Sequence, residues 1–449
     1  MKRTRLFSLL LCSIMIISGC GKKEKSAAGE TNLDDNHANH GYHAIMETEN
    51  GYYYNFGSMG HTNADNYLGN SMEFKHFLRY YDKETGETIL LCNKPECEHN
   101  GSDSCTATYK KMGIINTVMY DNQLYVYAVE HSGTIISMNL YRVSLDGSSI
   151  DKVGTVLEVE NTLGQGVAFM PEQATSFGTN HLNCFIIHRG YAYLPYYLRI
   201  GKASKGFMGG GLAQMNLETG ETKIIHELEY MTSNYPYNLR GVGNYVYMDM
   251  YNTKRYDITT GTLDYPGAMA EMLPKIVLDM VTEERLYNLD SVYDEETDTN
   301  SEFLTCFVYD AAMGTPLPEE NFETDISWNE VKNFWQSFAY EDMLVVAAGN
   351  RVIFYGGQGE NSGKKLGEIA FEYKKDDTIY ADTYGIELTF QISNGKLYKV
   401  CNPIHKIHYE NVPDTEIPGT YWSYEVYSCP IEDILNGNGE WTFAFAYTP

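Results

Sequence analysis

The sequence predicts an all-β protein, and more specifically a β-propeller of seven blades with four antiparallel strands in each blade. Two observations lead to this fold class. A strand–turn–strand unit recurs along almost the whole chain after residue 40, and many of the strands are apolar on both faces. Sheets that stack around a common axis bury both faces of their strands, as propeller blades do. Six or eight blades are the alternative counts.

The chain of 449 residues begins with the features of an export signal. Three of the first five residues are basic, and residues 6–17 form an apolar stretch that is too short to span a bilayer. The stretch ends in "ISGC" (17–20), which resembles the lipobox of bacterial lipoproteins. This resemblance implies cleavage before Cys20 and attachment of lipid to that residue. An ordinary secretory signal with a chance cysteine is the alternative.

These features divide the chain into three parts. Residues 1–19 are the expected signal peptide, residues 20–40 form a polar tether that starts at the lipidated cysteine, and residues 41–449 form the propeller. Removal of the signal takes away three positive charges and changes the formal net charge from −27 to −30. Such acidity argues against a nucleic-acid partner. We therefore expect a protein held on the cell membrane by lipid and displayed outside the cytoplasm.

Tight turns define the repeat. Each unit has a short strand, a turn with glycine near its end, and a second strand, because glycine supplies the positive φ that such turns need. The clearest units are "YYDKETGETILL" (80–91), "YRVSLDGSSIDKV" (141–153), "MNLETGETKII" (215–225), "RYDITTGTLDY" (255–265) and "VYDAAMGTPL" (308–317). Two weaker units bring the count to seven: "EDMLVVAAGNRVIFYGG" (341–357) and "NGKLYKVCN" (394–402).

The strands between these turns are not amphipathic. Residues 124–129 and 245–250 are nearly unbroken apolar or aromatic runs, whereas a sheet with one face in water would alternate apolar and polar residues. The best helix candidate is residues 327–338. There Ser327 and Glu330 have capping-box spacing, and Trp328, Val331 and Trp335 would share one face. We interpret this helix as a single insertion.

The lipobox, the G-x-x-Y-x-Y strand starts and the T-G-E turns together resemble exported bacterial β-propeller lipoproteins of the broad TolB-like and WD40-like group. The resemblance covers nearly all of the chain after residue 20. It implies a binding or scaffolding role and names no ligand. The repeated pattern of GH and WD dipeptides that marks true WD40 blades is missing.

Long segments are expected on one face of the propeller. If the strands of a blade are named A to D along the chain, the A–B and C–D turns lie on one face. The B–C loops and the connections to the next blade lie on the other. The long segments are B–C loops or connections: 57–76, 92–116, 198–212, 294–302 and 402–422. Insertions gathered on one face are typical of a binding surface in repeat proteins.

The side chains of these segments are the candidate ligand contacts. Aromatic rings beside polar groups suit a carbohydrate, a peptide or a small polar ligand. The candidates are His61, Tyr67, Arg199, Lys202, Lys205, His405, His408, Tyr409, Tyr421 and Trp422.

The sequence favours a binding module over an enzyme. It has neither the G-x-S-x-G nucleophile motif nor the H-E-x-x-H zinc motif. A catalytic pair could still form among its 60 carboxylates, because the separation of such a pair is decided in space. A surface polysaccharide-degrading or lyase-type propeller enzyme is therefore one alternative function. A scaffold for envelope assembly is another.

Cys92, Cys97, His99 and Cys105 lie within fourteen residues, in the connection from the first to the second blade. Three thiolates and an imidazole form a set that a structural Zn²⁺ accepts. A local disulfide between two of the cysteines is the alternative, since an extracytoplasmic location permits it. In both cases the predicted role is structural: to hold a long connection.

Overall fold

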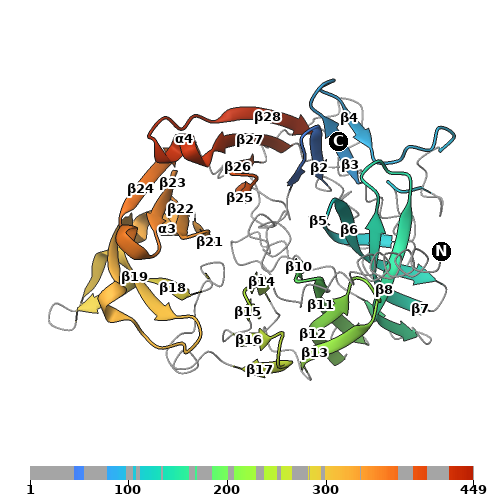
Figure 1. Ribbon diagram of the computed structural model, residues 1–449, viewed down its shortest axis with the longest axis horizontal. Coiled ribbons are helices and arrows are strands. Elements are labelled where there is room, and N and C mark those ends of the chain that lie inside the picture. The colour runs from blue at the N-terminus through green and yellow to red at the C-terminus, as the bar shows by residue number, and fades with distance from the viewer. Residues whose placement is uncertain are drawn as a thin grey trace, which may run out of the picture.

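The computed structural model shows sheets arranged in a ring around a central axis (Figure 1). It describes residues 45–54, 78–97, 105–107, 112–132, 135–160, 167–168, 185–200, 207–228, 237–249, 254–264, 282, 284–294, 299–333, 335–372, 388–401 and 424–447. Seven antiparallel sheets follow one another along the chain, which confirms the seven-bladed propeller. Residues 1–44, which contain the predicted signal peptide and tether, lie outside the described residues. Among the described residues, no helix is long and apolar enough to cross a membrane.

The first four blades each contain four strands in sequence order, from the axis outward (Figure 1). In blade 3 the short strand β9 (Val167–Ala168) also pairs with β11. The strands are β1 (Ile45–Glu47), β2 (Gly51–Tyr54), β3 (Arg79–Asp82) and β4 (Thr88–Leu90); β5 (Met112–Tyr120), β6 (Gln123–Ser132), β7 (Ile135–Val143) and β8 (Ile150–Glu160); β10 (Ile186–His188), β11 (Tyr191–Ile200), β12 (Phe207–Asn216) and β13 (Thr222–Leu228); β14 (Tyr237–Val242), β15 (Tyr245–Asp249), β16 (Lys254–Asp257) and β17 (Thr262–Asp264).

Blade 5 has three strands in the described part of the chain, and blades 6 and 7 have four each. The strands of blade 5 correspond to B, C and D. The N–H of Ala311 donates to the carbonyl of Glu284 (2.9 Å), as the N–H of Lys83 donates to that of Asn50 (2.9 Å) in blade 1. The strands are β18 (Arg285–Asp294), β19 (Thr299–Asp310) and β20 (Phe322–Ser327); β21 (Trp335–Tyr340), β22 (Met343–Ala348), β23 (Arg351–Gly356) and β24 (Lys365–Ala370); β25 (Leu388–Ser393), β26 (Lys396–Cys401), β27 (Tyr424–Pro430) and β28 (Thr442–Tyr447).

The C–D turns have the structure that the repeat predicts. In blade 1, Oδ1 of Asp82 accepts hydrogen bonds from the N–H groups of Glu84 and Thr85, both at 2.8 Å. Gly86 closes the turn at φ +73°. Asn216, Asp257 and Asp310 begin the equivalent turns in blades 3, 4 and 5. A side-chain acceptor and a glycine four residues later therefore form each turn locally, which is why the sequence alone predicts it.

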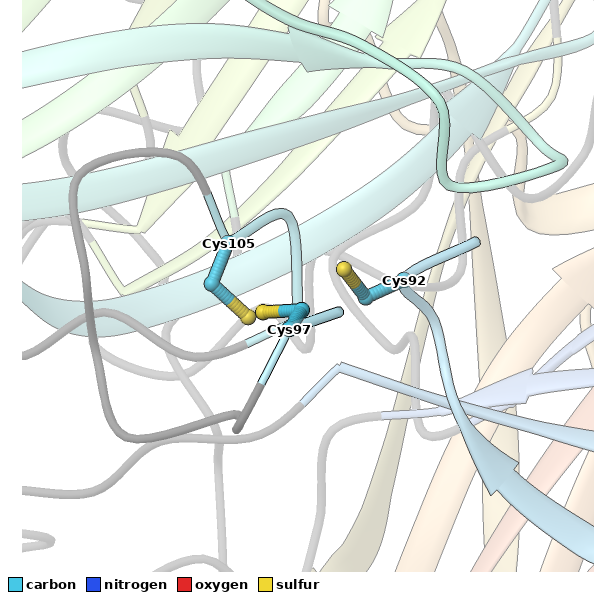
Figure 2. A group of neighbouring side chains, drawn as sticks. All are labelled: Cys92, Cys97 and Cys105. Atoms are coloured by element: carbon cyan, nitrogen blue, oxygen red, sulfur yellow. The ribbon is translucent and has the colours of Figure 1, made fainter. Parts of the chain in front are cut away.

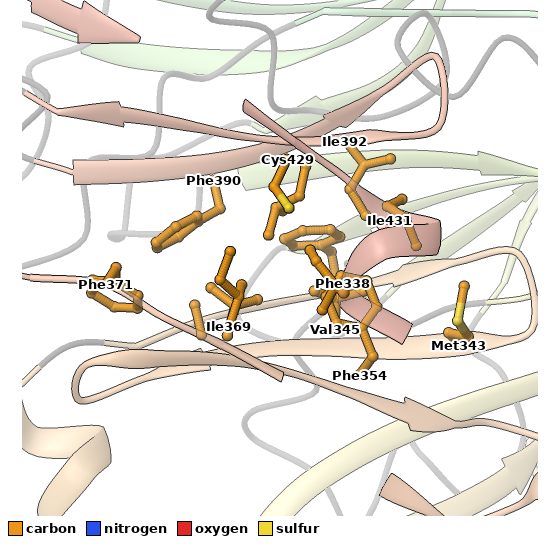
Figure 3. Close-up of a cluster of buried hydrophobic side chains, with 14 of the residues drawn as sticks. Phe338, Met343, Val345, Phe354, Ile369, Phe371, Phe390, Ile392, Cys429 and Ile431 are labelled. Atoms are coloured by element: carbon orange, nitrogen blue, oxygen red, sulfur yellow. The ribbon is translucent and has the colours of Figure 1, made fainter. Parts of the chain in front are cut away.

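Apolar side chains fill the space between neighbouring blades. Figure 3 shows the cluster between blades 6 and 7, where Phe338, Val345 and Phe354 of blade 6 face Phe390 and Ile392 of blade 7. Every residue of β22 is buried, as expected for a strand that is covered on both faces.

The predicted helix at 327–338 is only partly correct. The capping box exists, because Glu330 accepts the N–H of Ser327 (2.8 Å) and the Ser327 hydroxyl accepts the N–H of Glu330 (3.4 Å). The helix α3 (Trp328–Asn333) has only six residues. Trp335 belongs to β21, and Trp328 is 47% exposed, so the apolar face that we predicted does not form. A second short helix, α4 (Ile431–Leu435), lies in blade 7, between β27 and β28.

The ring closes through side chains, since every described strand pairs within its own blade. Gln391 of β25 donates from Nε2 to the carbonyl of Ile45 in β1 (2.6 Å) and accepts the N–H of Ile45 at Oε1 (3.2 Å). Gln336 of β21 binds the N–H and carbonyl of Phe390 in the same way, both at 2.8 Å. The junction of blades 7 and 1 therefore uses the same contact as the junction of blades 6 and 7.

Glu47 of β1 adds an ionic contact to this closure. Its buried carboxylate accepts hydrogen bonds from Lys83 (2.8 Å), from Lys396 (2.9 Å) and from the hydroxyl of Tyr398. Burial alone would raise the pKa of Glu47, but the hydrogen bonds from these three side chains outweigh burial and hold the pKa below its usual value. Nearby, the rings of Tyr52 and Phe445 stack with centroids 5.0 Å apart.

Candidate functional site

In the described part of the chain, the paired B and C strands differ in length between blades. In blades 2, 3 and 5 they are built from strands of 9 to 12 residues: β6, β7, β11, β12, β18 and β19. In blades 1, 4, 6 and 7 the corresponding strands have 4 to 7 residues. Because the chain turns at alternate faces of a four-stranded blade, the three hairpins with long described strands extend from the same face.

Two of the predicted loops are largely strands. In segment 198–212, Arg199 pairs with Met208 and Ile200 pairs with Phe207, so β11 and β12 run almost to the tip. In segment 294–302, Asp294 pairs with Thr299. Segment 92–116 also ends in a strand, since β5 starts at Met112. Segments 198–212 and 294–302 are B–C connections, as expected, but strand pairing reaches further into them than the sequence indicated.

Glycines explain why the sequence of β12 looked like a loop. A Cβ atom at Gly211 would lie 2.2 Å from the carbonyl oxygen of His226 and 2.6 Å from the hydroxyl of Tyr196. Glycine is therefore needed where neighbouring side chains and backbone approach the strand closely.

One of the ten candidate ligand contacts lies in the described part of the chain. Arg199 is in β11, opposite Ala168 of β9 on one side and Met208 of β12 on the other. The short strand β9 thus braces the hairpin near its tip, a contact that the sequence did not indicate. The other nine candidates lie outside the described residues and stay predictions: His61, Tyr67, Lys202, Lys205, His405, His408, Tyr409, Tyr421 and Trp422.

A polar network supports the hairpin of blade 2, and sequence analysis missed it. Glu130 of β6 accepts hydrogen bonds from the hydroxyl of Tyr141 (2.7 Å) and from the amide of Asn139 (3.0 Å). Thr155 of β8 donates to the carbonyl oxygen of the Asn139 side chain (2.9 Å). Burial, together with the hydrogen bond to Glu130, raises the pKa of Tyr141, which keeps its proton for this contact. The network ties three strands together, and sequence analysis missed it because its members meet only when β6, β7 and β8 pair.

The second candidate site is a group of three cysteines after β4. The Sγ atoms of Cys92, Cys97 and Cys105 lie within 4.8 Å of one another (Figure 2), and none of the three cysteines is in a disulfide. Cys105 is buried, whereas Cys92 and Cys97 are partly exposed. This grouping agrees with the expectation that the cysteines act together. His99, the predicted fourth member, lies outside the described residues.

Backbone contacts fix both ends of this segment at the junction of blades 1 and 2. The hydroxyl of buried Thr106 lies 2.8 Å from the carbonyl oxygen of Leu91 and 2.7 Å from that of Gly147. The N–H of Leu78, next to β3, donates to the carbonyl of Ala107 (2.9 Å). Because Gly147 lies in the C–D turn of blade 2, the cysteine group lies beside that short turn. The group also lies at the end of blade 1 where β3 begins and β4 ends, because the N–H of Leu91 donates to the carbonyl of Leu78, and this is the face expected for a connection between blades.

The environment of Cys92 favours its ionised form. Burial raises the pKa of the Cys92 thiol, but hydrogen bonds from the N–H groups of Lys94 and Thr106, from the Thr106 hydroxyl and from Cys97 lower it to about 6. The thiolate is the form of cysteine that binds metals. The three cysteines could therefore hold a metal ion, and neither their number nor their spacing requires a disulfide.

Comparisons with known proteins add no family. No family model and no curated protein matches the sequence. Among solved structures, the chain is similar to an α-L-arabinanase from Penicillium chrysogenum complexed with arabinobiose, with 8% identity, coverage of 86% of this chain and 90% of that chain, and a TM-score of 0.34. It is similar to an oligogalacturonate lyase in complex with manganese, with 9% identity, coverage of 81% and 70%, and a TM-score of 0.28.

A third similar structure is the WD40 domain of SCAP from fission yeast, with 9% identity, coverage of 91% of this chain and 88% of that chain, and a TM-score of 0.29. Likenesses this distant concern the fold alone. They range from enzymes to a WD40 domain, so they support no argument about ligand or reaction.

Proposed function

We propose that this protein is a lipid-anchored β-propeller, displayed outside the cytoplasm, that recognises a carbohydrate, a peptide or a surface partner without catalysing a reaction. The observation that carries the proposal is the extension of the B–C hairpins of blades 2, 3 and 5 from one face of the ring. Extended hairpins present side chains on a rigid support, which lowers the entropy lost on binding.

The lipid anchor of the proposal rests on the sequence. The apolar segment ends directly in "ISGC" (17–20), and the polar residues after Cys20 provide a tether. Labelling of growing cells with an alkynyl palmitate should mark the protein. The Cys20→Ala variant should carry no label, and label on that variant would contradict the anchor.

A shortened hairpin tests the binding face. Leu198 and Gly209 are paired in the ladder, so residues 199–208 can be replaced by an Asn-Gly turn between them. We expect the protein to lose at least about tenfold in affinity for the ligand found on a glycan and peptide array, roughly 1.4 kcal/mol. The melting temperature should change little, because the base of the hairpin and its packing remain.

The control lies on the opposite face of the same blade. Glu218 and Glu221 are exposed in the turn between β12 and β13, and their replacement by alanine should leave binding unchanged. Equal binding by the shortened variant would contradict the assignment of the B–C face.

Two other functions make different demands. A surface polysaccharide-degrading or lyase-type enzyme would release products from a panel of polysaccharides. A scaffold for envelope assembly would retain a protein partner on a column and bind no glycan. A cation held by the cysteine group would contribute to stability in any of these functions, because it would tie residues 92–105 together at the junction of blades 1 and 2.

A further inference from the structure

Three thiols from different positions in the sequence meet at the junction of blades 1 and 2. Cys92 lies two residues after the end of β4, the last strand of blade 1, and Cys105 directly precedes buried Thr106. Cys97 returns to them through a tight turn, in which its N–H donates to the carbonyl of Lys94 (3.0 Å). Each cysteine is therefore brought to the group by its own local contact.

The separation of the sulfur atoms suits a single ion. All three Sγ atoms lie within 4.8 Å of one another (Figure 2). A tetrahedral Zn²⁺ with Zn–S bonds of about 2.3 Å places its sulfur ligands roughly 3.8 Å apart, which small side-chain rotations reach from this arrangement. A disulfide needs only two sulfur atoms about 2.05 Å apart and would leave the third thiol without a role.

We propose that Cys92, Cys97 and Cys105 together bind one thiophilic divalent cation, Zn²⁺, which fastens the connection between blades 1 and 2. Each thiol gives up its proton on binding, so the ion is held by three thiolates. The ion closes segment 92–105 on itself. The segment begins directly after Leu91 and ends directly before Thr106, whose hydroxyl contacts the carbonyl oxygens of Leu91 and of Gly147 in the C–D turn of blade 2. The site stabilises the ring at the junction of blades 1 and 2.

Metal analysis of the full-length chain tests the proposal. The protein is purified in detergent without chelator, and its zinc content is measured by mass spectrometry. We expect about one zinc per chain, falling below about 0.1 in Cys97→Ser, because loss of one thiolate opens a structural site. Cys97 is the best position for this change, since its side chain is partly exposed and adds little to the core.

Cys401→Ser is the matched control. Like Cys97, Cys401 is in no disulfide and is partly exposed, but it lies in β26 of blade 7, so this variant should keep its zinc. Zinc that persists in Cys97→Ser, or zinc lost equally from both variants, would overturn the proposal.

A measurement on the unchanged protein avoids the risk that a variant does not fold. Alkylation followed by peptide mass spectrometry should show Cys92, Cys97 and Cys105 protected in the zinc-loaded protein and modified after chelator treatment. Uptake of Co²⁺ by the chelated protein should give the strong visible absorption of tetrahedral thiolate ligation. A chelated protein that takes up neither Zn²⁺ nor Co²⁺, or a disulfide between any two of these cysteines in protein purified under reductant, would overturn the proposal.

Discussion

Replacement of Gln391 by leucine should measure how firmly the ring is closed. The side chain of Gln391 is 4% exposed and bonds both backbone groups of Ile45, which is 346 residues away in sequence. Leucine has a similar size but neither donates nor accepts a hydrogen bond. Gln391→Leu therefore leaves the N–H and the carbonyl of Ile45 without this partner, in a place that water does not reach.

The expected cost follows from two buried backbone groups. At about 1–2 kcal/mol for each unsatisfied group, the free energy of unfolding should fall by about 2–4 kcal/mol. Unfolding entropy of about 2.1 cal/mol/K per residue gives roughly 0.8 kcal/mol/K for a propeller of about 400 residues. The melting temperature should therefore fall by about 2–5 °C.

Differential scanning calorimetry of the two glutamine variants is the assay. Gln336→Leu removes the same pair of contacts between blades 6 and 7, so it is the matched variant for an ordinary blade junction. We expect the two variants to lose stability equally, because the structure shows the same contact at both places. A melting temperature of Gln391→Leu equal to that of the wild type would refute the reasoning, and a much larger loss than in Gln336→Leu would show that ring closure needs this contact more.

Three further predictions concern the same side of the ring. The pKa of Glu47 is held below its usual value of 4.5, so its ionised form stabilises the fold above pH 4.5, and this contribution is lost as the pH falls through the folded pKa. Glu47→Gln should therefore be less stable than the wild type at pH 7, and the difference in stability should disappear in acid. Gly147→Ala should destabilise more than Gly261→Ala: both glycines have φ near +70°, but only at Gly147 would a Cβ meet backbone, 2.8 Å from Leu91. His99→Ala should weaken zinc binding, because the spacing C-x4-C-x-H-x5-C makes His99 the expected fourth ligand.

Each of these has a result that would contradict it. A stability gap for Glu47→Gln that is constant from pH 7 down to pH 3 would show that the carboxylate contributes no charge effect. Equal melting temperatures for Gly147→Ala and Gly261→Ala would mean that the backbone at Leu91 moves to accommodate the added methyl group. Zinc content and affinity unchanged in His99→Ala would assign the fourth ligand position to another group.

The turns and the number of blades could be predicted from the sequence because they depend on neighbouring residues. Asp82 and Gly86 form their turn through contacts within five residues, and the same pattern recurs at Asn216 and Asp257. The capping box of Ser327 and Glu330 was predicted for the same reason. The length of the helix was not, because Trp335 pairs with Ala348 as the first residue of β21.

Contacts between distant segments were decided only by the tertiary structure. The sequence placed three cysteines in one connection, but that they lie beside the C–D turn of blade 2 depends on Gly147, more than forty residues after Cys105. The extended hairpin at β11 and β12 depends on pairing with β9 and on the close approach of Tyr196 to Gly211. No sequence motif marks Gln391. It closes the ring because the arrangement of seven blades around the axis brings β25 next to β1. Local propensity determines strands and turns, whereas register, junctions and closure depend on packing between groups that the chain brings together only when it folds.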